Sequence, residues 1–264
     1  MSYVDIPIAR LLVVVAMMAI PIVLSRRAGL GLERDLAWGA LRGAAQLLAV
    51  GYVLLVLFSH QRPAWVALML AIMLVVAGFT SAQRVDRGPG TARLFPWTLL
   101  AITAGSAAAL VPVFVFVVVP TPWFEARYLV PIGGMVIANA MNVVALVNER
   151  VFAMASAERG RIEAMLALGA SPERALAPDV RAALRAALTP TINGLFTVGL
   201  VSLPGMMTGQ IVSGTAPDHA VRYQIVILYQ LVVVASVSGS LAATFARRLL
   251  FTKREQLVAY SDDR

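Results

Sequence analysis

Seven long apolar stretches restrict what this chain can fold into. Each is close to the ~20 residues that an α-helix needs to cross the hydrocarbon core of a bilayer. With 59% hydrophobic and 14% charged residues, the composition excludes both a water-soluble globule and a disordered chain. The sequence therefore predicts an all-α, polytopic membrane protein with about seven transmembrane helices. They are expected at Ile6–Leu24, Leu36–Phe58, Ala64–Ala82, Leu94–Val119, Leu129–Val147, Thr189–Ile211 and Arg222–Ala246.

The positively charged residues lie mostly in alternate connectors. Arginines cluster after the first, third, fifth and seventh stretches, whereas the opposite side has only Arg62, Arg127 and Arg222. Because cytoplasmic loops are enriched in Lys and Arg, this bias predicts an N-terminus outside and a C-terminus inside. The net charge of +8 follows from this placement and does not indicate a nucleic-acid partner. We expect a single membrane domain over residues 1–264, multi-pass in the cell membrane and in contact with the lipid bilayer.

Several kinds of functional site are excluded because the chain lacks the residues that they need. The chain has no cysteine and two histidines, which excludes disulfides, thiolate metal sites and a multi-histidine metal site within one copy. Lys253 is the only lysine, and no Gly-Lys-Ser/Thr phosphate-binding motif is present. No acidic residue lies in the middle of a stretch, which argues against a proton relay or an intramembrane hydrolase. We expect that the chain is not an enzyme and that any energy enters from another subunit.

Arg42 is a charged residue within the second stretch. It lies about two turns inside, with Gln46 one turn further along the same face. It either contacts an anion or backbone in a cavity, or it snorkels to the cytoplasmic interface or pairs with Glu33 or Asp35. A possible exit site for a cation on the outer side also stays open. Its candidate residues are Asp5, His60, Glu125, Asp218 and His219.

The longest aqueous segment, residues 148–188, has a helical pattern. Its first part is amphipathic, with charges on one face and apolar residues on the other. A glycine follows, which is typical of a helix end, and a serine and a proline then mark a new helix start. The pattern predicts a helix, a glycine corner and a second helix. The residues that carry it are Arg159, Ile162, Glu163, Met165, Leu166, Gly169, Ala170, Ser171 and Pro172.

Part of this segment resembles the EAA loop of ABC importer permeases. Glu163 and Ala164 are followed by Gly169, six positions after the acid. In EAA loops this arrangement forms a coupling helix that enters a cleft in the ATPase. The resemblance implies that residues 148–188 are a cytoplasmic coupling loop, which docks a separate ATPase that binds ATP and Mg. A solvated connector or a membrane-surface helix is the alternative.

Motifs along nearly the whole chain resemble the UPF0014 family. The most distinctive is Leu203-Pro204-Gly205-Met206-Met207-Thr208-Gly209-Gln210, since composition alone does not explain such a run inside an apolar stretch. Other matching segments are Gly43-x-x-Gln46-Leu47, Pro131-Ile132-Gly133-Gly134-Met135, Asn139-Ala140-Met141-Asn142 and Leu168-Gly169-Ala170-Ser171-Pro172.

The resemblance implies an ABC transporter permease of the FetB type in the bacterial inner membrane. Such a permease would be a homodimer, would pair with a separate ATPase and would export iron or another metal. Two alternatives stay open. One is a permease for a sugar nucleotide or small organic solute, and the other is a non-transporting membrane scaffold.

The sixth stretch is predicted to be interrupted. Pro204, Gly205 and Gly209 should break its helix, because proline removes a hydrogen bond and glycine lets the backbone bend. Freed carbonyls at that depth are tolerated only against protein or a water-lined cavity. We therefore expect a translocation path here, with packing through small residues as the alternative. The path residues are Asn139, Asn142, Ser202, Pro204, Gly205, Met206, Met207, Thr208 and Gln210, and metal ligands stay unassigned.

Overall fold

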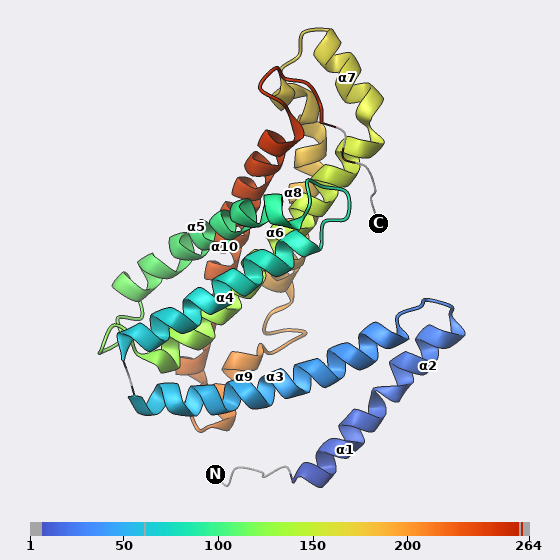
Figure 1. Cartoon of the computed structure of the whole chain (residues 1–264). Coiled ribbons are helices and arrows are strands. Elements are labelled where there is room, and N and C mark those ends of the chain that lie inside the picture. Colours follow the sequence, from blue (N-terminus) through green and yellow to red (C-terminus); the bar gives the residue numbers. More distant parts are fainter. Residues whose placement is uncertain (1–6, 61, 259, 261–264) are drawn as a thin grey trace.

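This computed structural model describes residues 7–60, 62–258 and 260. Within them the regular structure is α-helical, apart from two isolated β-bridges. Helices α1 to α3 form an N-terminal arm, and α4 to α10 form a bundle (Figure 1). Their bounds are α1 Ile8–Met17, α2 Ala19–Arg27, α3 Glu33–His60, α4 Pro63–Gln83, α5 Thr91–Phe116, α6 Ala126–Ala157, α7 Arg159–Ala167, α8 Pro172–Thr197, α9 Gly205–Val212 and α10 Pro217–Leu250.

Five helices are long and apolar enough to cross a membrane, namely α3, α4, α5, α6 and α10. They coincide with five of the seven predicted stretches and confirm an all-helical, polytopic membrane protein. At most of their ends these helices run several residues beyond the predicted bounds. A spanning helix does not have to stop where the hydrocarbon core stops, since its backbone bonds are internal and its polar flanks remain in water.

The other two predicted stretches are each divided between two helices. A single turn residue, Met18, separates α1 from α2, and Ile6 lies outside the described residues. In the sixth stretch, α8 ends at Thr197 and α9 begins only at Gly205. The first stretch, expected as one helix, is therefore two, whereas the interruption expected in the sixth stretch is present.

The bundle is packed through small residues. A Cβ atom added to Gly105 of α5 would lie 1.9 Å from the Oγ of Ser238 on α10, so these two helices are in close contact. The Thr98 hydroxyl on α5 donates a 2.8 Å hydrogen bond to the carbonyl of Gly78 on α4. Small side chains let helix backbones approach, which is the usual way for membrane helices to associate.

The arm contacts the bundle near one end of α3. Leu57, in the last turn of α3, packs with Val66 of α4 and Ala126 of α6. Across the apolar part of each helix, 6% of α3 is buried, against 56% of α6. At the far end of α3, the Ser25 hydroxyl donates to Glu33 at 3.1 Å and fixes the turn from α2. Figure 1 shows α3 diverging from the bundle towards this turn.

Candidate coupling and translocation elements

The predicted glycine corner lies at the end of the bundle formed by α7. Gly169 follows the helix with φ of 84°. The N–H groups of Gly169 and Ala170 donate to the carbonyls of Leu166 and Met165 at 2.9 and 3.0 Å. These two bonds make a Schellman motif, which favours glycine because other residues are strained in the left-handed conformation. The prediction that Gly169 ends the helix is confirmed.

The predicted start of the second helix is also confirmed. Ser171 is the N-cap of α8, and its side chain accepts a hydrogen bond from the backbone N–H of Arg174 at 3.4 Å. Pro172 occupies the first helical position, where a backbone N–H would have no partner within the helix, so the missing N–H of proline costs nothing. The corner between α7 and α8 is therefore a defined structure and not a loose connector.

The residues predicted to dock an ATPase differ in exposure. Arg159 and Glu163 are exposed and form an ion pair of 2.7 Å along α7. Ile162 is fully buried in the main hydrophobic core, so it holds α7 in place and offers no surface to a partner. Leu168, which the sequence analysis did not select as a docking residue, is 88% exposed at the corner. The sequence signal that could have identified Leu168 is a large apolar side chain directly before a glycine that ends a helix.

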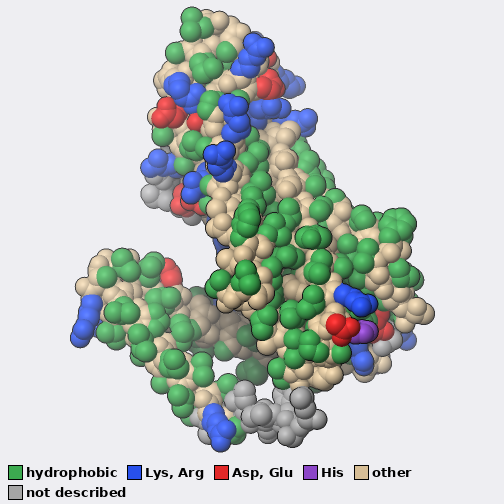
Figure 2. Space-filling model, turned by 180° about the vertical axis from the view of Figure 1, so that it is seen from behind, with side chains coloured by type: hydrophobic (Ala, Val, Ile, Leu, Met, Phe, Trp, Pro, Cys, Tyr) green, Lys and Arg blue, Asp and Glu red, His purple; other side chains and the backbone are tan. Residues whose placement is uncertain are grey.

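Among the other predicted docking residues, Pro172 is buried, Met165, Leu166, Ala170 and Ser171 are partly buried, and Gly169 is exposed. Met165 and Leu166 pack on the main core. Figure 2 shows acidic and basic side chains gathered around this end of the bundle. Such a charged end is typical of a region outside the hydrocarbon core.

An ion pair that the sequence analysis missed joins α7 to α8. Nη2 of Arg161 lies 2.5 Å from Oδ2 of Asp179, and Nη1 donates to the Ala175 carbonyl at 3.1 Å. The Asp179 side chain is 4% exposed, and its hydrogen bond raises the pKa of Arg161 above the ordinary value. An unpaired carboxylate at such a buried position would be costly. We call this contact the α7–α8 clamp.

A second ion pair joins the same region to α10. Nη2 of Arg247 lies 3.4 Å from Oε1 of Glu173 in the first turn of α8. Both side chains are partly exposed, and such pairs contribute at most about 1 kcal/mol. In the turn of α8 that follows Glu173, Ala175 and Leu176 are fully buried in the main core. The beginning of α8 is thus fixed by packing, a helix cap and two ion pairs.

From the corner, α8 continues without interruption to Thr197. At 1.5 Å per residue its 26 residues span about 39 Å. One face of α8 is buried through Ala183 and Ala187, against α6 and α10. The helix therefore connects the charged corner directly to the interruption in the sixth stretch.

The interruption, residues 198–204, is confirmed but lies further upstream than predicted. Gly199 has φ of 80° and donates its N–H to the Ser202 carbonyl at 2.9 Å, which turns the chain. Pro204 is the N-cap of α9 and Gly205 its first residue. Gly209 lies within α9, so its predicted role in breaking the helix is wrong, because its neighbours keep the helical bonds. We call residues 198–204 the break loop.

The break loop leaves backbone oxygens without partners. Five of its carbonyls accept no hydrogen bond from the described residues, namely those of Val198, Gly199, Leu200, Val201 and Leu203. Leu200 is 89% exposed at the tip of the loop. Within a bilayer each unsatisfied carbonyl would cost several kcal/mol, so the loop requires water or protein around it.

The two asparagines predicted to face the break loop form bonds between helices. The Asn139 amide donates to the Leu231 carbonyl on α10 at 2.9 Å, and its oxygen accepts from Thr191 on α8 at 3.4 Å. The oxygen of Asn142 accepts from Arg84, the C-cap residue of α4, at 3.1 Å. Both asparagines stabilise the bundle, so their direct contact with a substrate stays a prediction.

The remaining predicted path residues lie in or beside α9. Ser202 is exposed in the break loop, and the Thr208 hydroxyl donates to the Pro204 carbonyl at 3.1 Å. Met206, Met207 and Gln210 are partly buried. Nothing in their geometry distinguishes the methionines as metal ligands.

A polar stripe on α8 escaped the sequence analysis. It consists of Arg185, Thr189, Asn193 and Thr197, which are all exposed and follow one another at intervals of four residues. The hydroxyls of Thr189 and Thr197 donate to the carbonyls of Arg185 and Asn193, at 2.7 and 3.0 Å. The stripe leads along α8 to the break loop, and its four-residue spacing was the signal that could have revealed it.

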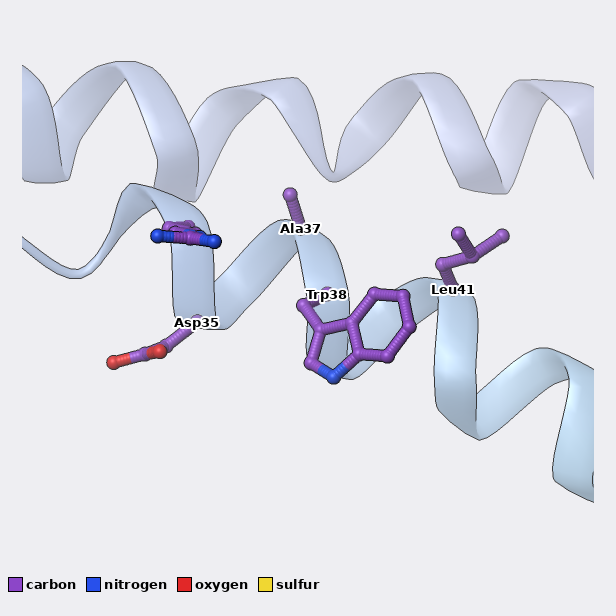
Figure 3. A pocket seen from close by; sticks show the side chains of 5 residues that line it. Asp35, Ala37, Trp38 and Leu41 are labelled. Carbon is purple, nitrogen blue, oxygen red and sulfur yellow. The ribbon is translucent and has the colours of Figure 1, made fainter.

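The charged residues of the arm and of the outer side form no built site. The described residues contain no group of three His, Asp or Glu side chains that could hold a metal, and Asp5 lies outside them. His219 lies 3.6 Å from its neighbour Asp218. Near the start of α3 a shallow pocket is lined by residues such as Asp35, Trp38 and Leu41, whose side chains point in different directions (Figure 3).

Arg42 and Gln46 are exposed on α3, with no hydrogen-bond or ion-pair partner among the described residues. The predicted pairing of Arg42 with Glu33 or Asp35 is therefore not seen. Glu33 instead accepts a hydrogen bond from Ser25. Separation along one helix explains this, because Glu33 and Asp35 lie about 10 to 14 Å along the axis from Arg42.

Taken together, the long apolar helices, the charged corner and the interrupted helix define a polytopic α-helical membrane protein with a charged helix corner at one end. The chain belongs to UPF0014, described as an uncharacterised protein family, whose profile matches residues 8–251. This confirms the family resemblance seen in the motifs.

Three relatives are similar over most of their length. A UPF0014 membrane protein of Synechocystis, slr1647, is 38% identical over 87% of this chain and 88% of its own. The probable iron export permease protein FetB of Escherichia coli is 36% identical over 95% and 93%. Protein ALUMINUM SENSITIVE 3 of Arabidopsis thaliana is 34% identical over 95% and 88%. No solved structure matches the chain.

Proposed function

We propose that this chain is the permease subunit of an ABC transporter that exports iron or another metal species across the bacterial inner membrane. In this proposal two copies of the chain assemble with two copies of a separate ATPase, which binds ATP and Mg. The name of the Escherichia coli relative supports iron as the substrate. The lack of a nucleotide-binding motif in this sequence is consistent with a separate ATPase.

The single observation that carries the proposal is the continuity of α8. One end of this helix belongs to the charged corner, and its other end opens into the break loop. A movement imposed on the corner by an ATPase would reach the break loop without passing through a loop, because α8 is one helix that includes Pro178 and Pro190. Coupling between distant sites needs such a rigid element together with a part that has two arrangements.

The cytoplasmic end of the mechanism is the exposed side of the corner. Arg159, Glu163 and Leu168 offer charged and apolar contacts to a partner, while Ile162 keeps α7 fixed on the bundle. Because the α7–α8 clamp joins the two helices, α7 and the first turns of α8 would move together. ATPase closure then displaces α8 as a unit.

The membrane end of the mechanism is the break loop. Its five unpaired carbonyls and the exposed Ser202 offer neutral oxygen atoms in a region without acidic side chains. Carbonyl oxygens can replace part of the hydration shell of a cation and still release it, because they carry no full charge. Displacement of α8 would alternately open and close access to these oxygens.

Vesicles that contain the chain, with and without its ATPase, test the proposal directly. We expect ATP-dependent movement of radiolabelled iron only when both subunits are present. Gly169→Trp should insert normally but lose ATPase association and transport together, since a bulky residue is strained at this φ and would occupy the open space that a docked ATPase needs. Gly31→Trp is a matched control, because Gly31 also has a left-handed φ, of 70°, but lies in the turn before α3.

Two results would contradict the proposal. If iron movement is the same with and without the ATPase, the chain is not an ABC permease for iron. If Gly169→Trp abolishes transport while association and stimulated ATP hydrolysis stay normal, the corner is not the docking site.

A further inference from the structure

The arm and the bundle enclose an open notch. In Figure 1 α3 leaves the bundle near its contact with α4 and α6, and the opposite view in Figure 2 shows empty space between the arm and the charged end of the bundle. Most of α3 is unburied, as described above. In a membrane this notch must hold lipid, water or protein.

The arm carries polar groups that lipid cannot satisfy. Arg42 and Gln46 are exposed without partners among the described residues. A charged side chain at the bilayer centre costs about 2.5 to 3.5 kcal/mol, and less towards the interface. Gly39 and Gly43, four residues apart, have no atom within 4 Å of an added Cβ. Small residues at this spacing let a second helix approach closely.

The bundle carries polar groups of the same kind. Asn193 and Thr197 continue the polar stripe of α8 to the break loop, where Ser202 is exposed and five carbonyls accept no hydrogen bond within the described part of the chain. Hydrocarbon cannot hydrogen bond to any of these groups. Both the arm and the bundle therefore need a protein surface or protein-bound water in place of lipid.

The arm cannot fold onto the bundle of its own chain without disrupting the apolar contacts at the C-terminal end of α3. Phe58 lies under the guanidinium of Arg127 at 5.9 Å, and Leu57 packs on Val66 and Ala126. The connector from α3 to α4 is only residues 61 and 62. These contacts set the angle at which α3 leaves the bundle, so closing the notch within one chain would disrupt this apolar cluster.

We infer that a second copy of this chain occupies the notch, so that each arm packs against the bundle of the other copy. The inference rests on the proposed function, which includes a homodimer, and it assigns the surface through which the two copies of that homodimer contact each other. A two-fold arrangement uses the same surface on both copies and therefore forms this contact twice. The break loops of the two copies then line one path, and each loop is incomplete without the partner.

Cysteine cross-linking tests this assignment, because the chain has no cysteine of its own. Two differently tagged copies are expressed together, one with Gln46→Cys and the other with Asn193→Cys, and membranes are treated with a flexible bismaleimide. We expect a cross-linked species that carries both tags. As a control, Leu100→Cys replaces Asn193→Cys, because Leu100 is exposed on an apolar part of α5 and should give no such product.

Two further variants make the result decisive. Adding Gly43→Leu to the Gln46→Cys copy should cause loss of the doubly tagged product, because the added side chain separates the helices. A single chain carrying both cysteines should give no internal cross-link. An internal cross-link without a dimer would show that the arm closes on its own bundle and would overturn the inference.

The absence of any cross-link between copies would also overturn it. Co-purification of the ATPase with the same variants is measured in parallel. If the ATPase binds while the copies do not cross-link, the arm contact is wrong but the permease proposal stands. If the copies cross-link while no ATPase binds, the permease proposal fails and the dimer contact stands.

Discussion

The two ends of α8 are held very differently. At the corner, a helix cap, the α7–α8 clamp, the ion pair to α10 and fully buried side chains fix the first turns. At the other end, α8 stops at Thr197 and the chain enters the break loop, whose tip is exposed and five of whose carbonyls accept no hydrogen bond from the described residues. The same helix is therefore firmly held at the corner and weakly constrained at the break loop.

This difference suggests how a membrane helix can transmit movement. Buried, fully bonded regions tend to move as units, whereas regions with few buried contacts open at low free energy. A permease needs both properties in one element, because force must arrive at one end and access must change at the other. Substitutions at the two ends should therefore have different effects on stability and transport.

The largest effect on stability is expected for Arg161→Ala at the corner. Loss of the guanidinium leaves Asp179 buried without its partner, so the free energy of unfolding should fall by about 2 kcal/mol. Thermal unfolding in detergent micelles measures the change. Arg159→Ala is the matched control, because the exposed pair with Glu163 should contribute at most about 0.5 kcal/mol. Equal effects of the two substitutions would show that the clamp does not fix the corner.

An intermediate effect, opposite in sign at two glycines, is expected at the two ends of α7. Gly169→Ala should lower the free energy of unfolding by about 1 kcal/mol, because alanine is strained at a φ of 84°. Gly160→Ala should raise it by about 0.5 to 1 kcal/mol, since Gly160 lies inside the helix with open space around it. The same unfolding assay compares them. Destabilisation by both would contradict the role of the Schellman motif.

At the membrane end, the double substitution Pro204→Ala and Gly205→Ala should slow transport more than it changes stability. Alanine favours a regular helix, so the break loop should lose one of its two arrangements while unfolding changes by less than about 1 kcal/mol. Iron transport in vesicles with the ATPase measures the rate. Gly209→Ala, within α9, is the control that should leave the rate unchanged. Normal transport by the double variant would remove the break loop from the mechanism.

The smallest effect is expected for Thr191→Val in the middle of α8. Its hydroxyl makes a long bond of 3.4 Å to Asn139, so its loss should cost only about 0.5 kcal/mol. Thr189→Val should change stability even less, because Thr189 is exposed and bonds to its own helix. Calorimetric unfolding of the two variants tests whether the contact with α6 matters. A loss as large as that of Arg161→Ala would show that the middle of α8 is held as firmly as the corner.

Features that depend on neighbours in the chain could be predicted from the sequence. The apolar stretches gave the helix class and five spans, because the length of an apolar run is compared directly with the thickness of a bilayer. Gly169 and Ser171 were predicted as a helix end and a helix cap, since both roles depend on backbone bonds within one turn. Pro204 correctly indicated an interruption, although Gly199 and not Gly209 turns the chain.

Only the tertiary structure decided which side chains meet across helices. Asp179 lies 18 positions from Arg161, Asn139 lies 52 from Thr191, and Asn142 lies 58 from Arg84. Periodicity shows which face of a helix is apolar, but not which helix covers that face. For this reason Ile162 resembled a docking residue in the sequence and is a core residue in the fold. The open arm also follows from packing, because α3 is as apolar as α6 and yet differs from it in how much the bundle buries.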